Sequence, residues 1–240
     1  KVAFFMPTAG GPCRFGQYNQ FHRILFDRLG FEKAELITPS NDTSYQDVAG
    51  EHGQKFRLRA WKGFLAADYI RKIHREIRPY EINKGETDKL YQDAIHRLES
   101  CIEKGSSGLH RVLAEIAGDF VAIPADRSIR RPVVGIIGEI FMRDNAGCNG
   151  NISNRLEELG LEVLVGPFSE WIVYSTHRFT RDSRWKNDKK GIIKSKIQGI
   201  GQELISRMLT RGIRKFTDHE KDVSLHDMLR LSNRYVSEFY

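Results

Sequence analysis

Two apolar runs, each followed by a glycine-rich loop and then a helical pattern, constrain the fold of this chain more than any other feature. The first run, Val2–Met6, leads into the loop Thr8–Tyr18, and the second, Val133–Met142, leads into the loop Arg143–Asn151. Each loop holds one cysteine at the same relative place. Because open α/β sheets build their sites at the carboxyl ends of strands, we expect both cysteines to border a site.

The spacing of apolar residues extends both runs into strand–helix–strand units. The first unit comprises strands over Val2–Met6 and Ala34–Ile37 and a helix over Gln17–Leu29, with Phe21, Ile24, Leu25 and Leu29 on the apolar face that packs against a sheet. The second comprises strands over Val133–Ile140 and Glu162–Val165 and a helix over Ile152–Leu159. Two units of this layout predict one parallel sheet that contains Val2–Met6 and Val133–Ile140.

Helical patterns fill most of the remaining chain. We expect 1–240 to form one α/β fragment of a larger protein, with a helical insertion around 58–126 and a helical C-terminal part over 190–240. In the C-terminal part, the helical spacing is carried by Ile193, Ile197, Ile200, Leu204, Met208 and Leu209.

Composition narrows the class of protein. The chain has 240 residues, 40% of them hydrophobic, and a formal net charge of +7, but acidic residues are mixed into its basic segments, so we expect no nucleic-acid partner. No apolar stretch approaches the roughly 20 residues of a membrane span, so we expect no membrane partner either. Three cysteines are too few for a disulfide scaffold and favour a reducing, cytoplasmic compartment.

The three cysteines differ in their surroundings. Cys13 lies among glycines beside Arg14, which favours a thiolate that acts as nucleophile or metal ligand, although a loop cysteine without a role is equally consistent. Cys148 lies before the Ile152–Leu159 helix, whose dipole favours a thiolate, although ordinary helix capping explains the same residues. Cys101 shares a helical face with Leu98 and is expected to be buried.

Other site signals are weak or absent. Glu139, near the end of an apolar strand, is either a site carboxylate or a charge leaving the sheet toward water. The histidines lack the spacing of a closed zinc site, and neither glycine loop matches a nucleotide-binding signature. Backbone amides at helix N-termini remain able to hold a phosphate.

Three segments together are similar to a known family. Gly10–Tyr18, Gly138–Arg143 and Asn151–Gly160 resemble the dehydratase-like region of the acyl-CoA dehydratase activase-related proteins, which join it to ATPase modules similar to the 2-hydroxyglutaryl-CoA dehydratase activator. The resemblance implies a flavodoxin-like parallel sheet with helices on both faces and a [4Fe–4S] or double-cubane cluster held by strand-end cysteines. It carries over Cys13 as a ligand, whereas Cys148 departs from the family pattern.

The resemblance implies a part of an ATP-driven, low-potential electron-transfer protein that is inactive as an isolated fragment. We expect Cys13 and Cys148 to bind metal, with Arg14, Glu139 and Asn145 beside the cofactor, and the missing ligands to come from the remaining domains of the parent chain. Two alternatives stay open. One is a cluster-free, flavodoxin-like module that binds a nucleotide or the phosphate of coenzyme A, and the other is a structural domain that orients its neighbours.

Overall fold

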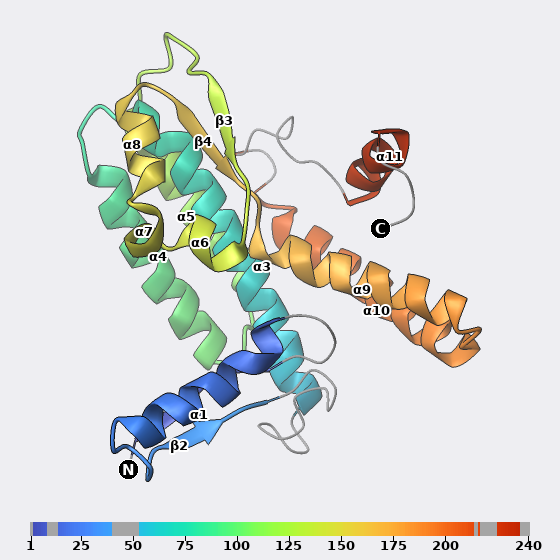
Figure 1. Cartoon of the computed structure of the whole chain (residues 1–240). Helices are drawn as coiled ribbons and strands as arrows, with labels where there is room; N and C mark the ends of the chain where they lie inside the picture. The colour runs from blue at the N-terminus through green and yellow to red at the C-terminus, as the bar shows by residue number, and fades with distance from the viewer. Residues whose placement is uncertain (1, 9–13, 40–52, 214–215, 217–224, 236–240) are drawn as a thin grey trace. The chain divides into compact units, whose positions relative to one another are not determined.

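The computed structural model describes residues 2–8, 14–39, 53–213, 216 and 225–235. The chain divides into two compact units, Lys1–Ala60 and Trp61–Tyr240, and each is described by itself. Most of the described residues are helical (Figure 1). The elements are β1 (Ala3–Phe5), η1 (Arg14–Gln17), α1 (Tyr18–Arg28), β2 (Glu35–Ile37), α3 (Gly53–Ile77), η3 (Arg78–Tyr80), α4 (Glu86–Glu103), α5 (Leu109–Ala122), β3 (Val133–Ile136), α6 (Ile140–Asp144), α7 (Ala146–Asn149), α8 (Ile152–Glu158), β4 (Glu162–Val165), α9 (Phe168–Trp185), α10 (Lys189–Thr210) and α11 (Leu225–Tyr235).

The prediction of a flavodoxin-like sheet with helices on both faces is wrong. The described strands form two separate parallel pairs, β1 with β2 and β3 with β4. Both strand–helix–strand units are therefore present, but β1 and β3 do not share a sheet. Three long helices, α3 to α5, lie between β2 and β3 in the sequence and form their own core. After β4 the chain continues into α9 rather than into another strand, so neither strand pair is extended into a larger sheet.

The first strand–helix–strand unit consists of the parallel pair β1–β2 and the helix α1. Ala3 pairs with Glu35 and Phe5 with Ile37, and the ring of Phe26 on α1 packs on Phe4 with centroids 4.6 Å apart. The predicted apolar face of α1 is largely exposed, including Phe21 and Ile24. A pair of three-residue strands is too narrow to cover it.

The core of the second unit lies among α3, α4 and α5, which run side by side in Figure 1. Cys101 is buried within it, as its place on the apolar face of α4 predicted. The buried core residues include Leu65, Ile70, Ile73 and Ile77 on α3, Ala94 and Leu98 on α4, Leu109, Leu113, Ile116, Ala117 and Phe120 on α5, and Leu209 of α10.

The strand predicted over Val133–Ile140 is shorter than expected. β3 ends at Ile136, and α6 begins at Ile140. Gly138 takes a φ of 140°, a conformation that only glycine adopts readily, and this breaks the strand before Glu139. β4 spans Glu162–Val165, as predicted, and pairs with β3 from Val133 opposite Glu162 to Ile136 opposite Val165.

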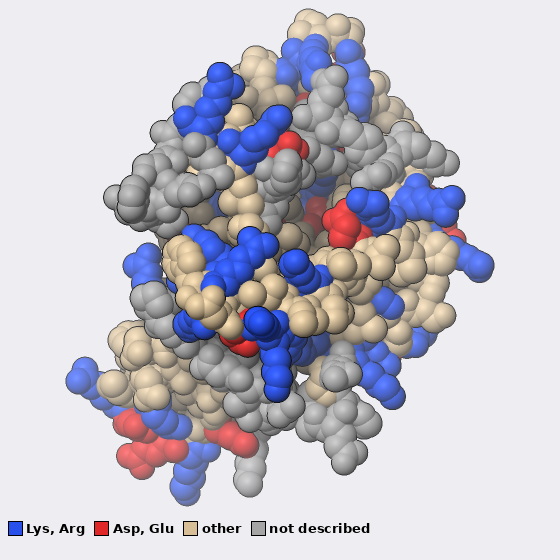
Figure 2. Space-filling view, turned by 90° about the vertical axis from the view of Figure 1, so that its right-hand side faces the viewer, with Lys and Arg blue, Asp and Glu red and all other residues tan. Residues whose placement is uncertain are grey.

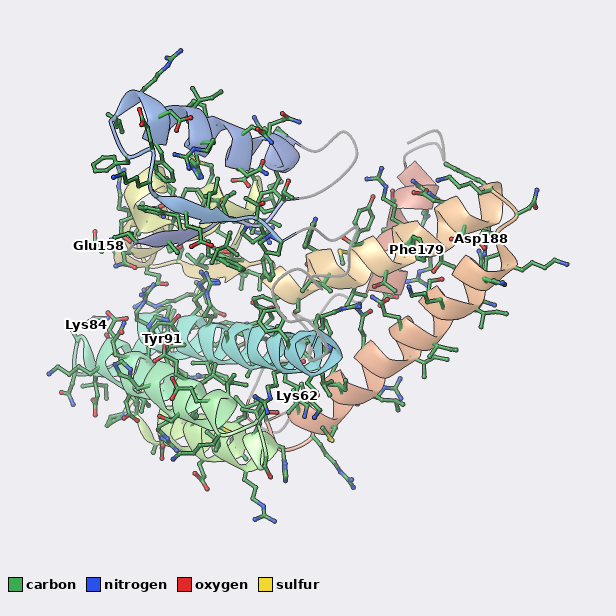
Figure 3. The ribbon with its side chains drawn as sticks, turned by 90° about the horizontal axis from the view of Figure 1, so that it is seen from below. Lys62, Lys84, Tyr91, Glu158, Phe179 and Asp188 are labelled. Carbon is green, nitrogen blue, oxygen red and sulfur yellow. The ribbon has the colours of Figure 1, made fainter. Side chains whose placement is uncertain are left out.

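Helices α9 and α10 form an antiparallel hairpin, which extends to the right in Figure 1. Figure 3 shows the two helices side by side, with Phe179 on α9 and Asp188 at the turn. Asp188 begins α10 by accepting a hydrogen bond from the amide of Gly191 at 3.0 Å. Within the described residues, no helix combines the length and the apolar composition that crossing a membrane requires.

The hairpin packs through small and polar side chains. Thr180 donates to the hydroxyl of Ser195 at 2.9 Å, and Gln198 donates to Thr176 at 3.1 Å. Leu209 of α10 is buried and Ile205 packs against the core, but five other apolar side chains of α10 are exposed. We call this set the apolar stripe: Ile193, Ile197, Ile200, Leu204 and Met208, with exposed fractions between 51% and 66%.

Candidate functional site

The carboxyl end of β3 leads into a loop that contains three of the predicted site residues. Glu139 precedes α6, and its Oε2 accepts a hydrogen bond from the amide of Met142 at 2.9 Å. Asn145 precedes α7, and its Oδ1 accepts from the amide of Cys148 at 3.0 Å. Both side chains therefore cap the short helix that follows them, which is what Asp, Asn and Ser side chains ordinarily do at helix starts.

Cys148 is an exposed, free thiol. It lies inside the four-residue helix α7 rather than at the start of α8, which begins at Ile152. The helix-dipole argument that singled out Cys148 therefore does not hold, because a helix of one turn has little dipole. Cys148 therefore carries an accessible thiol, and the hydrogen bond from its amide to Asn145 holds its backbone in place.

The first predicted loop is described only in part. Cys13 lies outside the described residues. Arg14 is the first residue of η1 and is exposed. The hydroxyl of Thr8 donates to the carbonyl of Gly16 at 3.2 Å, which folds η1 against the end of β1. Because β1 and β3 belong to separate sheets, the argument that placed Cys13 and Cys148 at one crevice no longer applies.

Ion pairs from α3 occupy the edge where β3 and β4 end. Arg71 and Arg75 both donate to Asp144, the last residue of α6, the second at 3.2 Å. Burial, and after it the charge of Arg71, lowers the pKa of Arg75, while the hydrogen bond to Asp144 opposes this. Arg143 reaches across to the carbonyl of Gly166 at 2.9 Å, joining the loop after β3 to the end of β4.

A second set of pairs connects α8 and α4 to η3 and the end of α3. Arg78 makes two hydrogen bonds to Glu157, at 2.7 and 2.8 Å, and a third to Asp88 at 3.2 Å. His74 contacts the same Asp88 oxygen through Nε2 at 2.6 Å. Burial, then the charge of Arg78, lowers the pKa of His74 to about 4, although Asp88 opposes this shift.

The arginines of α3 and η3 are the residues that sequence reasoning missed. Arg71, Arg75 and Arg78 recur at the spacing that places residues on one helical face, and this signal is readable in the sequence. The spacing of these arginines did not stand out, because the segment also contains acidic residues and has the composition of an ordinary solvent-exposed helix face.

The start of α9 is also occupied by the chain's own carboxylate. Asp68 of α3 accepts hydrogen bonds from the amides of Phe168 and Ser169, at 3.0 and 2.7 Å. An anion would bind at such a helix start through the same amides. With Asp68 there, the site that a phosphate would use is filled.

The described residues do not supply the ligands that an iron–sulfur cluster needs. A [4Fe–4S] cluster takes three or four thiolates in most proteins. Across the described ranges, no three His, Cys, Asp or Glu side chains lie together as a metal site. Cys148 alone does not fit such a cluster, so the described residues form no cluster site of their own.

Comparisons with known proteins add nothing to this geometry. No protein-family model, no curated protein and no solved structure matches the chain.

Proposed function

We propose that this chain is an assembly module, a domain that joins and orients parts of a larger protein assembly through an apolar surface of α10. The observation that carries the proposal is the apolar stripe, which lies in the open while α10 turns small and polar residues toward α9. An apolar stretch of this length on a surface is typical of a contact with another macromolecule.

The energetics of the hairpin support this proposal. Burying an aliphatic side chain stabilises a protein by about 1.5 to 3 kcal/mol, and the stripe holds five such side chains outside the core. Folding of the second unit gains little from them, because they remain more than half exposed. Their aliphatic character is explained if a partner covers them.

The strand-end edge supports the same proposal over a phosphate-binding module. Glu139 and Asn145 cap their own helices, and Asp68 caps α9. Arg71 and Arg75 pair with Asp144. These side chains are thus engaged within the chain, and the edge holds elements together.

We place the module in the cytoplasm, since cysteines are sparse and Cys101 and Cys148 are free thiols, which suits a reducing compartment. The family resemblance would make the larger assembly an ATP-driven electron-transfer protein. In that setting the chain positions other parts of the assembly.

The proposal predicts that the stripe is covered in cells. A photo-crosslinking amino acid at position 200, in the middle of the stripe, is expected to give a covalent product with a macromolecule, because a partner lies against it there. Products are resolved on denaturing gels and identified by mass spectrometry. The same amino acid at Glu99, an exposed polar position on α4, is the matched control and is expected to give none. Equal yields at both positions, or no product at either, would contradict the proposal.

A second candidate function rests on the exposed thiol of Cys148. In it, the chain lends one thiolate to a cluster whose other ligands come from elsewhere in the assembly. Cys148→Ser is then expected to lower the iron bound by the full-length assembly after anaerobic reconstitution with iron and sulfide. Cys101→Ser is the control, since Cys101 is buried in the core and is expected to leave the iron content unchanged. Equal iron content in wild type and Cys148→Ser would reject this candidate.

A further inference from the structure

We infer that the partner on the apolar stripe is a second copy of this chain, bound with the two α10 helices antiparallel. This inference rests on the proposed function, because it names what covers the same surface. It is carried by the spacing of the stripe and by the charges along its edges.

The spacing is that of a two-stranded coiled coil. Ile193, Ile197, Ile200 and Leu204 follow one another at intervals of four, three and four residues, the alternation that keeps one seam facing a partner helix. With Met208 the stripe covers about 22 Å of helix, from a rise of about 1.5 Å per residue. A matching helix covers the four residues from Ile193 to Leu204, and Met208 lies beyond that seam.

An antiparallel pair brings opposite charges together. When Ile197 of one copy packs on Ile200 of the other, Ile193 meets Leu204 at both ends of the seam. Lys196 and Glu203, both exposed, lie along the same edge of the stripe. In this register Lys196 of each copy faces Glu203 of the other, which gives two symmetric ion pairs. Glu203 already holds Arg207 of its own helix at 2.6 Å, so the partner lysine joins an existing pair.

The opposite edge tolerates close approach. There Lys194 of one copy faces Gly201 of the other, where an added Cβ would meet nothing within 4 Å. A parallel pair would instead place Lys189 of one copy opposite Lys194 of the other, and like charges at these flanking positions oppose association. The charges along the two edges therefore select the antiparallel arrangement.

The turn of the hairpin favours the same direction. Basic side chains gather there, and Figure 2, which views the side toward which the hairpin extends in Figure 1, shows Lys and Arg spread widely over that face. They are Arg178, Arg181, Arg184, Lys186, Lys189, Lys190, Lys194 and Lys196, against Asp182 and Asp188. An antiparallel pair keeps the two basic turns at opposite ends, whereas a parallel pair would bring them together.

Charge reversal on the full chain tests the pairing, with the dissociation constant measured by sedimentation equilibrium. Lys196→Glu and Glu203→Lys are each expected to weaken self-association by about tenfold, since each breaks two ion pairs and creates two repulsions. The double variant K196E/E203K is expected to restore it to near the wild-type value. Lys194→Glu, the same change on the edge that faces Gly201, is the matched control and is expected to have little effect. Single variants that associate as wild type does, or a double variant that stays weak, would overturn the pairing.

Substitution at the centre of the seam tests the surface itself. Ile200→Asp is expected to abolish the dimer while the helical circular dichroism stays unchanged, because Ile200 makes little contribution to the core. Ile129→Asp, which alters another highly exposed isoleucine, is expected to leave the dimer intact.

The remaining outcomes separate this inference from the proposed function. A monomeric chain that still crosslinks at position 200 to a different protein overturns the second copy and retains the assembly module. A monomeric chain that binds vesicles containing phosphatidylserine through the stripe, with binding lost in Ile200→Asp, overturns the second copy in favour of a membrane surface. A monomeric chain that gives no crosslink at position 200 overturns both.

Discussion

Replacing Phe120 by alanine is expected to cost about 3 to 5 kcal/mol of the unfolding free energy of the second unit. The side chain of Phe120 is completely buried on α5, and its ring lies edge-on to that of His74. Removing the ring leaves a cavity among α3, α4 and α5, which the surrounding helices fill only in part. Urea denaturation followed by circular dichroism measures the loss.

The adjacent residue supplies the control. Val121 lies on the same helix but is half exposed, so Val121→Ala is expected to change the unfolding free energy by only about 0.5 kcal/mol. Similar losses in the two variants would show that α5 does not face the core as described.

Lowering the pH from 7 to 4 is expected to remove about 3 kcal/mol of stability through His74 alone. Burial, followed by the charge of Arg78, lowers the pKa of His74 from 6.5 to about 4 in the folded chain. Between these two values the unfolded chain binds a proton that the folded chain does not. The stability contributed by neutral His74 is therefore complete above about pH 6.5 and is lost as the pH falls toward 4.

The groups around His74 extend this pH dependence at its acid end. Burial raises the pKa of Asp88, but the hydrogen bond from His74 and the charge of Arg78 outweigh it and lower the pKa overall. Protonation of Asp88 therefore lowers the unfolding free energy further as the pH falls below the ordinary pKa of an aspartate. Arg75 adds positive charge near His74 throughout the range.

His74→Gln separates the two groups, because it removes the titrating ring and keeps a side-chain amide that can donate to Asp88. The variant is expected to lose the pH dependence between 6.5 and 4, measured as unfolding free energy in urea at a series of pH values. His96→Gln, at an exposed position on α4, is the control and is expected to retain it. A His74→Gln profile as steep as that of wild type would refute the assignment.

Local elements of this fold were readable from the sequence because their signals are local. The short apolar run in Glu162–Val165 predicted β4 to the residue, and the helix predicted over Ile152–Leu159 is α8, which spans Ile152–Glu158. The single sheet was not readable in the same way. Whether Val2–Met6 and Val133–Ile140 share a sheet depends on contacts across more than a hundred residues, and no local pattern encodes them.

The candidate site shows the same limit. The sequence identified Glu139, Asn145 and Cys148 as a strand-end group, and the structure places all three in the loop after β3. The sequence did not show that the side-chain oxygens of Glu139 and Asn145 accept hydrogen bonds from backbone amides of the following helices, because these bonds depend on the backbone geometry of the loop. The stripe on α10 was recognised as a helical pattern, but a pattern cannot tell which face turns inward. The small residues Ser195 and Gly191 decide that by packing against α9.

The cap that Asp68 places on α9 has a consequence for the order in which the chain folds. Its two hydrogen bonds join residues 100 and 101 positions apart. Contacts between neighbouring helices such as α4 and α5 close short loops and form early, whereas contacts at such separations form late. During synthesis, α3 to α5 leave the ribosome before α9, so we expect Asp68 to lie on a formed helix before the amides of Phe168 and Ser169 reach it. We therefore expect the helical core of α3 to α5 to form first and the α9–α10 hairpin to dock on it afterwards.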